Sequence, residues 1–313
     1  TLFRSLGEET AAYRVNVLLG PGLNVKRSPL CGRSFEYFSE DPYLSGKLAA
    51  GYVRGIQSTG VAACPKHFAV NSQELRRMAS DSILDERTLR ELYLTAFEIV
   101  VKEAHPKAIM SSYNKVNGVY ANENEHLLLD ILRKEWGFDG AVVTDWGGSN
   151  DHVQGVRNGS TLEMPSPGLG AARRLRKALD DGEVSEHTID TRVDELLDLV
   201  LSTDEAIRKA PRKFDEAAHH QLARRAAAES IVLLKNEDGI LPLKTGKKVT
   251  LIGDFAITPR YQGAGSSMVN PTRVDCLTDA AETAGLNLVG YCSGYERSGK
   301  PNKVYLEEAV AQA

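Results

Sequence analysis

Residues 108–146 read AIMSSYNKVNGVYANENEHLLLDILRKEWGFDGAVVTDW, and this stretch decides the fold class. Ala108–Ser111 and Ala141–Thr144 are short apolar runs typical of buried strands. Between them, residues 123–136 follow a helical pattern that Gly137 ends. A strand, a helix and a second strand in this order predict a βαβ unit, which pairs its two strands in parallel.

Strands and helices continue to alternate toward the N-terminus. Residues 15–19 and 61–64 have the composition of further strands, and residues 2–15 already read as a helix that runs into a strand. We therefore predict an α/β protein built on a parallel sheet, with a further segment upstream of Thr1. Asp85 is the expected N-cap of the helix before Ala108, and Asn122, with Glu125 three residues later, is the expected cap of the next helix.

After Pro165 and Pro167 the pattern becomes helical, over residues 171–179 and then 185–201 with Ser185 as the cap. We interpret the polar stretch 202–213 as a linker, followed by a helix over 215–230. Expected strands at 231–234 and 249–252 then reopen an α/β pattern. This reading divides the chain into a first domain (1–201), a linker with a connecting helix (202–229) and the start of a second domain (230–313).

Composition excludes some classes of function. The chain has 313 residues, of which 42% are hydrophobic and 26% charged, and its net charge is −4, so it lacks the basic surplus of a nucleic-acid binder. It contains no apolar run of the roughly 18 residues that a membrane span requires. We expect a soluble protein, cytoplasmic or secreted. The spacing of the cysteines and histidines predicts neither a metal site nor a cofactor.

Polar side chains follow each expected strand. Because the carboxyl ends of parallel strands meet on one face, these side chains are expected to converge on a pocket suited to a polyol. Any one of them could instead be a loop residue or part of a structural ion pair. The residues are Arg33 after the first strand, Lys66 and His67 after the second, Tyr113 and Asn114 after the third, and Asp145 and Trp146 after the fourth.

Longer motifs surround these positions. In chain order they are GPGLNVKRSPLCGRSFEYFSEDPYLSG, CPKHFAVNSQELRRM, MSSYNKVNG, LRKEWGFDGAVVTDWGG, LEMP and ESIVLLKNEDGILPL. This series resembles glycoside hydrolase family 3, in its β-glucosidase branch. The resemblance implies a (β/α)8-type TIM barrel, here lacking its N-terminal part, followed by an incomplete α/β sandwich domain. It also implies an enzyme that needs no cofactor.

The resemblance implies a role for each site residue. Asp145 matches the nucleophile of a retaining mechanism, in which a covalent glycosyl enzyme forms, although an Asp at such a turn can also cap the following helix. Arg33, Lys66 and His67 match contacts to sugar hydroxyls and are expected to keep Asp145 ionised. Arg33 could alternatively pair with Glu36 or Asp41.

Three aromatic and thioether positions complete the expected pocket. Tyr113 and Met110 resemble pocket-wall residues, and Trp146 is placed to stack on a sugar ring. For Met110, ordinary core packing is an equal alternative. Lys66 and His67 are consecutive, so both reach one sugar only if the backbone leaves regular strand geometry near residues 64–68.

The chain also departs from the family pattern. Where the family commonly reads AGLDLEMP, residues 158–165 read NGSTLEMP, so Thr161 replaces an Asp. An early sugar-binding Asp and the general acid/base Glu of the family have no counterpart, and the remainder of the enzyme is expected in the same chain or in another. The resemblance thus implies an exo-acting β-glucosidase whose substrate is a small β-glucoside. The alternatives are a β-xylosidase or related exo-glycosidase, and a non-catalytic sugar-binding fragment.

Overall fold

The computed structural model describes residues 2–313, which divide into two compact units at Glu229 and Ser230. Each unit is described by itself. Among residues 2–313, none of the helices combines the length and the apolar composition that crossing a lipid bilayer requires.

Parallel strands form the centre of the first unit. Their bounds are β1 (Val17–Leu18), β2 (Ala62–Ala63), β3 (Lys66–Phe68), β5 (Ala108–Ser111) and β8 (Ala141–Thr144). β1 pairs with β2, and β5 lies between β3 and β8 in a second parallel sheet. The prediction of an α/β fold with strands at β5 and β8 is confirmed, whereas β1 and β2 are shorter than expected.

Single parallel bridges extend this arrangement. Gly22 pairs with Lys66 on one side, and Val143 pairs with Leu162 on the other. A separate small sheet lies beyond the ends of β3 and β5 and contains β4 (Asp81–Ser82), β6 (Lys115–Val116) and β7 (Val119–Tyr120).

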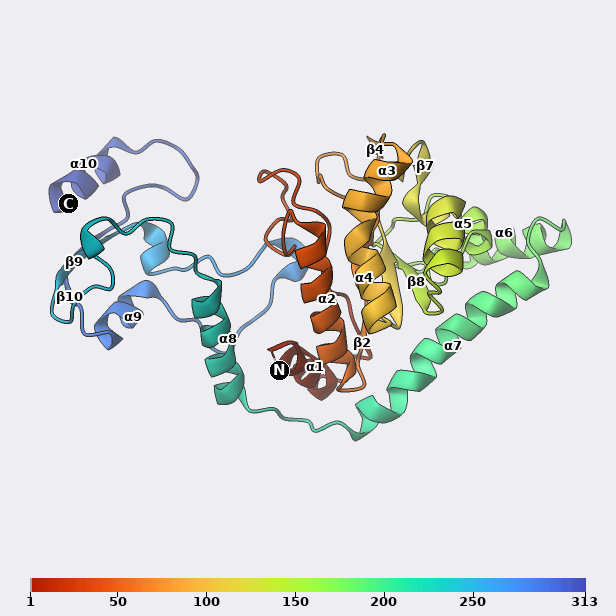
Figure 1. Cartoon of the computed structure of the whole chain (residues 1–313), viewed down its shortest axis with the longest axis horizontal. Coiled ribbons are helices and arrows are strands. Elements are labelled where there is room, and N and C mark those ends of the chain that lie inside the picture. Colours follow the sequence, from red (N-terminus) through yellow and green to blue (C-terminus); the bar gives the residue numbers. More distant parts are fainter. Residues whose placement is uncertain (1) are drawn as a thin grey trace. The chain divides into compact units, whose positions relative to one another are not determined.

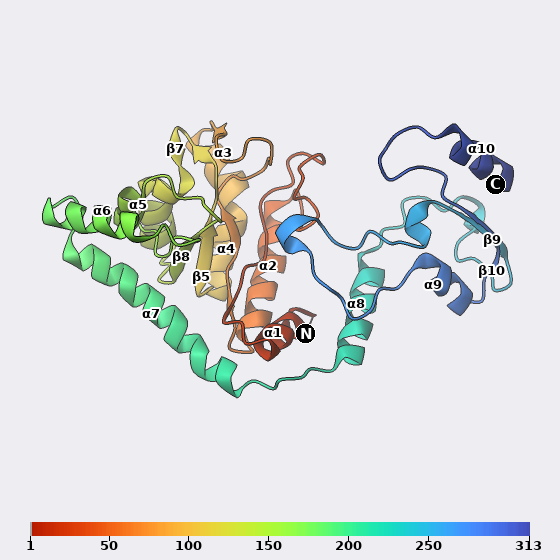
Figure 2. The same cartoon turned by 180° about the vertical axis from the view of Figure 1, so that it is seen from behind.

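Helices follow the strands, and Figures 1 and 2 show α2 and α4 running side by side. Gly46 of α2 permits this close packing, because a Cβ there would lie 2.8 Å from Ile99 Cδ1 of α4. The bounds in this unit are α1 (Leu2–Ala12), α2 (Pro42–Gln57), α3 (Glu86–Thr88), the π-helix η1 (Leu89–Leu94), α4 (Thr95–Ala104), the 3-10 helix η2 (Ala121–Glu123), the π-helix η3 (His126–Glu135), α5 (His152–Arg157), α6 (Leu169–Asp180), α7 (Glu186–Lys209) and α8 (Glu216–Ser230).

Two apolar clusters pack on the strands because successive side chains point to opposite faces. The larger cluster joins the strands to the helices and includes Phe68, Phe97 and Val142. The smaller cluster includes Cys64, Met110 and Val143. Together they fix the strands whose ends carry the polar residues described below.

Helix starts follow the sequence signals in two of three cases. The Asp85 carboxylate accepts the Thr88 N–H at 2.8 Å, and the Ser185 hydroxyl accepts the Thr188 N–H at 3.1 Å, as predicted. The cap before η3 is Asn124, whose Oδ1 accepts the Leu127 N–H at 3.1 Å. Asn122 was the wrong choice, because its side chain is engaged by Ser111.

The expected linker at 202–213 is also corrected. α7 continues through Lys209, because Leu199, Thr203 and Ile207 bury one face of this extension. The connecting helix predicted over 215–230 is present as α8.

The second unit contains a two-stranded parallel sheet of β9 and β10. Residues 231–234 do not form the predicted strand, since a strand requires a hydrogen-bonded neighbour and none pairs with them among the described residues. The bounds are the 3-10 helices η4 (Glu237–Gly239), η5 (Asp254–Ala256) and η6 (Gly265–Ser267), then β9 (Lys248–Ile252), α9 (Leu277–Thr283), β10 (Asn287–Cys292) and α10 (Lys303–Gln312).

Candidate active site

Asp145 lies directly after the last residue of β8, and its position is set mainly by backbone hydrogen bonds. Its N–H donates to Ser111 O at 3.2 Å, and its Oδ1 accepts the N–H of Trp146 at 2.7 Å. Its other oxygen, Oδ2, is buried and has no hydrogen-bond partner within residues 2–313. The alternative that Asp145 caps the next helix is wrong, because Asp151 caps α5 through the Gln154 N–H at 3.0 Å.

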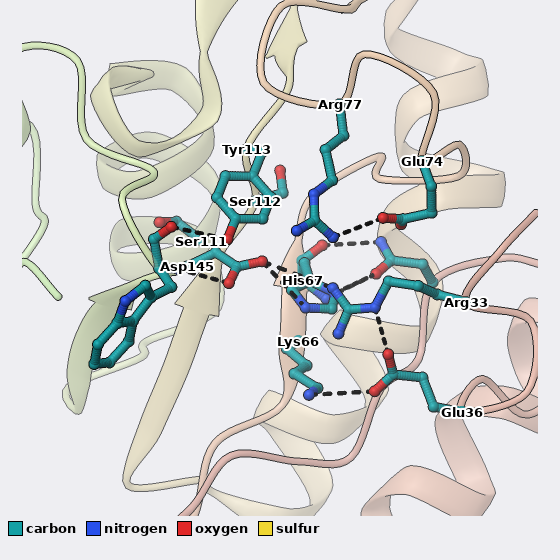
Figure 3. A network of polar contacts seen from close by, with 12 residues as sticks. Arg33, Glu36, Lys66, His67, Glu74, Arg77, Ser111, Ser112, Tyr113 and Asp145 are labelled. Carbon is teal, nitrogen blue, oxygen red and sulfur yellow. Dashed lines mark hydrogen bonds and ion pairs between the residues drawn. The ribbon is translucent and has the colours of Figure 1, made fainter. Parts of the chain in front are cut away.

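Arg33 lies beside Asp145, and Arg33 and Lys66 share the carboxylate of Glu36 (Figure 3). Arg33 Nη1 is 3.8 Å from Asp145 Oδ2, while Arg33 Nε donates to Glu36 Oε1. The other oxygen of Glu36 lies 3.2 Å from Lys66 Nζ. Arg33 therefore contacts both the expected nucleophile and Glu36. Burial alone would raise the pKa of Glu36, but the hydrogen bond from Arg33 and the charge of Lys66 hold that pKa below its ordinary value.

His67 faces the same carboxylate oxygen. Its Nε2 lies 3.4 Å from Asp145 Oδ2, and its Nδ1 lies 3.1 Å from the Tyr37 hydroxyl. Burial, together with the charges of nearby cations, lowers the pKa of His67 well below the ordinary value, so its imidazole is neutral at neutral pH. The expectation that His67 adds positive charge beside Asp145 is therefore corrected.

The backbone around Lys66 and His67 departs from regular strand geometry, as predicted. The peptide bond between them is cis, and the register between β3 and β5 shifts between Lys66 and Phe68. Asn24 holds this segment, since its Oδ1 accepts the His67 N–H at 2.7 Å and its Nδ2 donates to His67 O at 2.9 Å. Both side chains reach the network in Figure 3.

Tyr113 closes another side of the site. Its hydroxyl donates to Trp146 O at 2.9 Å, and burial together with the charge of Asp145 raises its pKa to about 12. The guanidinium of Arg77 lies over its ring, 4.5 Å from the centroid, and Arg77 Nη1 pairs with Glu74 Oε2 at 2.7 Å. This geometry is that of a cation–π contact.

The two remaining expected residues differ in exposure. Trp146 is 59% exposed, which leaves its indole available for contact. Met110 is 5% exposed and packs within the smaller apolar cluster, opposite Lys66 in the register. The geometry of Met110 therefore agrees with core packing.

Thr161, which replaces the Asp of the family pattern, lies elsewhere. Its hydroxyl accepts the N–H of Val142 at 3.0 Å and donates to Glu195 Oε2 at 2.5 Å. Glu195 also pairs with Arg133 and Arg192, each at 2.8 Å. This buried network surrounds the second residue of β8, whereas Asp145 follows the last.

The atoms that Asp145 and His67 present to each other indicate which chemistry this site can perform. His67 Nε2 and Asp145 Oδ2 face each other, and neither has a hydrogen-bond partner in the described part of the chain. A carboxylate with one free oxygen, a cation and a neutral imidazole suit hydrogen bonding to a sugar and nucleophilic attack on it.

Family comparisons agree with this chemistry. Residues 3–199 match the glycosyl hydrolase family 3 N terminal domain, and residues 231–313 match the glycosyl hydrolase family 3 C-terminal domain. The chain belongs to glycosyl hydrolase family 3. Within this family, it is 52% identical over 294 residues to thermostable beta-glucosidase B of Acetivibrio thermocellus. It is 44% identical over 319 residues to exo-alpha-(1->6)-L-arabinopyranosidase of Bifidobacterium longum.

A solved family 3 structure is also similar. The crystal structure of Bifidobacterium adolescentis GH3 beta-glucosidase superposes with a TM-score of 0.92 at 42% identity, covering 99% of this chain and 46% of that one. The matches to the two curated relatives cover 93% and 99% of this chain but only 39% and 42% of the relatives. The chain thus spans about two fifths of their length.

Sequence reasoning missed five polar residues of this family 3 site. Asn24, Tyr37, Glu74 and Arg77 were not singled out, and Glu36 was considered only as an alternative partner for Arg33. Glu74 and Arg77 lie in irregular turns, where no periodicity distinguishes Arg77 from Arg76. The available signal was their presence in the motifs around His67 and Arg33.

Proposed function

We propose that this chain carries the nucleophile and much of the sugar pocket of a retaining, exo-acting β-glucosidase that releases glucose from small β-glucosides. The observation that carries the proposal is Asp145 Oδ2 in a family 3 chain, a buried carboxylate oxygen that lies between Arg33 and His67 and accepts no hydrogen bond from residues 2–313. The β-glucosidase names of the relatives support the choice of reaction.

In the proposed mechanism, Asp145 Oδ2 attacks the anomeric carbon and the bond to the aglycone oxygen breaks. That oxygen leaves with the bonding electrons and takes a proton from a general acid that we place outside the described residues. Water then hydrolyses the glycosyl ester with retention. Throughout, Oδ1 remains hydrogen-bonded to the Trp146 N–H, so Oδ2 keeps its direction.

The surrounding residues hold the sugar. Arg33 and Lys66 are fixed by Glu36 and donate to hydroxyls, and the neutral His67 donates from Nε2 while Tyr37 donates to Nδ1. Tyr113 and the exposed Trp146 bound the pocket, and Met110 supports it from the apolar cluster. We further propose that the parallel strands belong to an incomplete (β/α)8-type barrel (1–201), joined through 202–229 to the start of an α/β sandwich (230–313).

Trapping tests the nucleophile. The reagent is 2,4-dinitrophenyl 2-deoxy-2-fluoro-β-D-glucoside, because its leaving group departs without a general acid and its fluorine slows hydrolysis of the glycosyl ester. We expect one label per chain on the peptide containing Asp145, and none in Asp145→Asn. A label on another residue would refute the assignment. Glucose binding without any label would favour the non-catalytic, sugar-binding alternative.

A second candidate is an exo-glycosidase for pentopyranosides, either a β-xylosidase or an enzyme like the relative named an arabinopyranosidase. A panel of 4-nitrophenyl β-D-glucoside, β-D-xyloside and α-L-arabinopyranoside separates these substrates by kcat/KM. The measurement uses the active protein that contains this chain. A preference of tenfold or more for either pentoside would replace the glucosidase proposal.

A further inference from the structure

Residues 145–151 connect the end of β8 to the N-cap of α5, and we call this segment the nucleophile loop because it begins with Asp145. Main-chain groups hold Asp145 on both sides. Its N–H donates to Ser111 O at 3.2 Å, and its carbonyl oxygen accepts the Gly148 N–H at 2.8 Å. The direction of the Asp145 side chain therefore depends on how firmly the loop is fixed.

Glu123, the last residue of η2, holds the far end of the nucleophile loop. Its Oε1 accepts the N–H of Asn150 at 2.8 Å and the N–H of Asp151 at 3.2 Å. The main chain of Glu123 is fixed as well, because its carbonyl oxygen accepts Asn158 Nδ2 at 2.7 Å. One carboxylate oxygen thus joins η2 to the two residues that precede α5.

Asn122, the residue before Glu123, supports the opposite end of the loop. Its Oδ1 accepts the Ser111 hydroxyl at 2.9 Å, and Figure 3 shows Ser111 next to Asp145. A Cβ at Gly155 would lie 3.1 Å from Asn122 Nδ2, so α5 packs directly on η2. Consecutive residues of η2 therefore support the nucleophile loop at both ends, and we call Asn122 and Glu123 the η2 brace.

The carboxylate of Glu123 and the loop stabilise each other. Glu123 is 3% exposed, and taking a carboxylate out of water is costly unless donors replace the water. Burial raises the pKa of Glu123 above its ordinary value, and the N–H groups of Asn150 and Asp151 oppose this shift most strongly. The buried carboxylate needs the donors of the loop, and the position of the loop depends on the carboxylate.

The residues expected to hold the sugar are fixed by other segments. Arg33 and Lys66 contact Glu36. His67 is held by Asn24. None of these five residues belongs to the nucleophile loop or to the η2 brace. The brace should therefore affect the carboxylate that attacks the sugar and not the groups that bind it.

We propose that Glu123 is a positioning residue for the reaction at Asp145, a role that rests on the proposed function of Asp145 as the nucleophile. Glu123 fixes the nucleophile loop so that Asp145 Oδ2 keeps one direction toward the anomeric carbon. A displacement of about 1 Å between reacting groups can lower a rate by about a hundredfold. Loosening the loop should therefore slow the attack while leaving the affinity for the sugar unchanged.

The test compares Glu123→Met with Glu123→Gln in the protein that contains this chain. Met fills a similar volume but offers only a weakly accepting sulfur, whereas the Gln carbonyl accepts both N–H groups. Labelling by the fluoroglucoside described above gives kinact and KI separately. Glu123→Met should lower kinact by about 10- to 100-fold with KI within about twofold, and Glu123→Gln should stay within about threefold of the parent in both. Glu125→Met, at an exposed position of the same segment, should label at the parental rate.

A second variant and a spectroscopic signal support this test. Ser111→Ala removes the hydroxyl that joins β5 to Asn122, and should lower kinact by about 3- to 10-fold, the equivalent of one hydrogen bond. Fluorine NMR of 5-fluorotryptophan at Trp146, assigned by the signal that Trp146→Phe removes, follows the loop itself. This resonance should shift or broaden in Glu123→Met and stay unchanged in Glu123→Gln. Circular dichroism melting identifies the variants that are folded.

Parental kinact in folded Glu123→Met or, if that variant does not fold, in Ser111→Ala would overturn the role of Glu123. So would an equal loss in Glu123→Met and Glu123→Gln, a loss that falls on KI, or an unchanged Trp146 resonance in Glu123→Met. In each of these cases, a parent labelled at Asp145 leaves the proposed nucleophile in place. A label on another residue of the parent would overturn the nucleophile, and the role of Glu123 with it.

Discussion

Replacing Glu36 with Gln should weaken sugar binding without removing the nucleophile. Each carboxylate oxygen of Glu36 holds one cation, Arg33 at Oε1 and Lys66 at Oε2. Gln keeps the shape of the side chain, but its carbonyl serves only one cation. Its amide N–H₂ then faces the other cation. The contact with the first cation is weakened because the carbonyl is uncharged, and the contact with the second cation is lost.

The size of the effect follows from these two contacts. A hydrogen bond to a charged group contributes about 1.5–3 kcal/mol. The Glu36 side chain is 17% exposed, and solvent therefore screens part of the loss. We expect a net cost of about 2 kcal/mol, which corresponds to a factor of about thirty in kinact/KI. Because Arg33 and Lys66 would contact the sugar before and during the reaction, most of the change should appear in KI.

The assay is the rate of covalent labelling by the fluoroglucoside described above, followed by intact mass. Glu40→Gln is the matched control, since Glu40 is an exposed carboxylate of the same loop, and it should label at the parental rate. A Glu36→Gln protein that is folded and labels within threefold of the parent would refute the idea that Glu36 positions the cations. So would a loss confined to kinact.

Three further predictions concern stability. His219 Nδ1 lies 2.7 Å from a Glu9 carboxylate oxygen and His219 Nε2 lies 3.2 Å from one of Glu8, both in α1. Burial alone would lower the pKa of His219, but the hydrogen bonds to Glu9 and Glu8 raise it above its ordinary value. The stabilisation from these contacts is therefore complete below about pH 6.5 and is lost as the pH rises through the folded-state pKa. His219→Gln should therefore lower Tm more at pH 6 than at pH 9, and an equal loss at both would contradict this. Glu195→Ala removes the carboxylate that pairs with the buried Arg133 and Arg192, so it should lower the free energy of unfolding, measured with urea, by about 3–5 kcal/mol. Glu216→Ala, at an exposed position, should lower it only slightly. Asp151→Ala should cost about 1 kcal/mol through the lost cap of α5, with labelling of Asp145 retained, and loss of labelling would count against separate roles for these two carboxylates.

The sequence was most informative where burial and periodicity coincide. β5 and β8 are buried on both faces, so their apolar runs have clear limits and their bounds were predicted to the residue. Residues 231–234 have an equally apolar pattern, yet they form no strand, because pairing depends on a neighbouring strand that local sequence cannot specify. α7 was predicted too short for a related reason, since its polar extension is stabilised by tertiary burial.

The same distinction applies to the site. Arg33, His67 and Asp145 were found because each follows a strand or lies in a motif, and the structure brings Arg33 and His67 each within 4 Å of Asp145 Oδ2. The neutral state of His67 could not be predicted, because it depends on complete burial among cations rather than on neighbouring residues in the chain. The shared use of Glu36 by two cations is likewise a property of three-dimensional packing.

The hydrogen bond from the Trp146 N–H to Asp145 Oδ1 has an evolutionary consequence. Because the donor is a main-chain group, substitution of any neighbouring side chain leaves it in place, with proline at position 146 as the evident exception. Mutations that reshape the pocket wall can therefore accumulate without turning the carboxylate away from its target. A lineage built on this geometry is free to change which sugar it accepts while inheriting the same direction of attack.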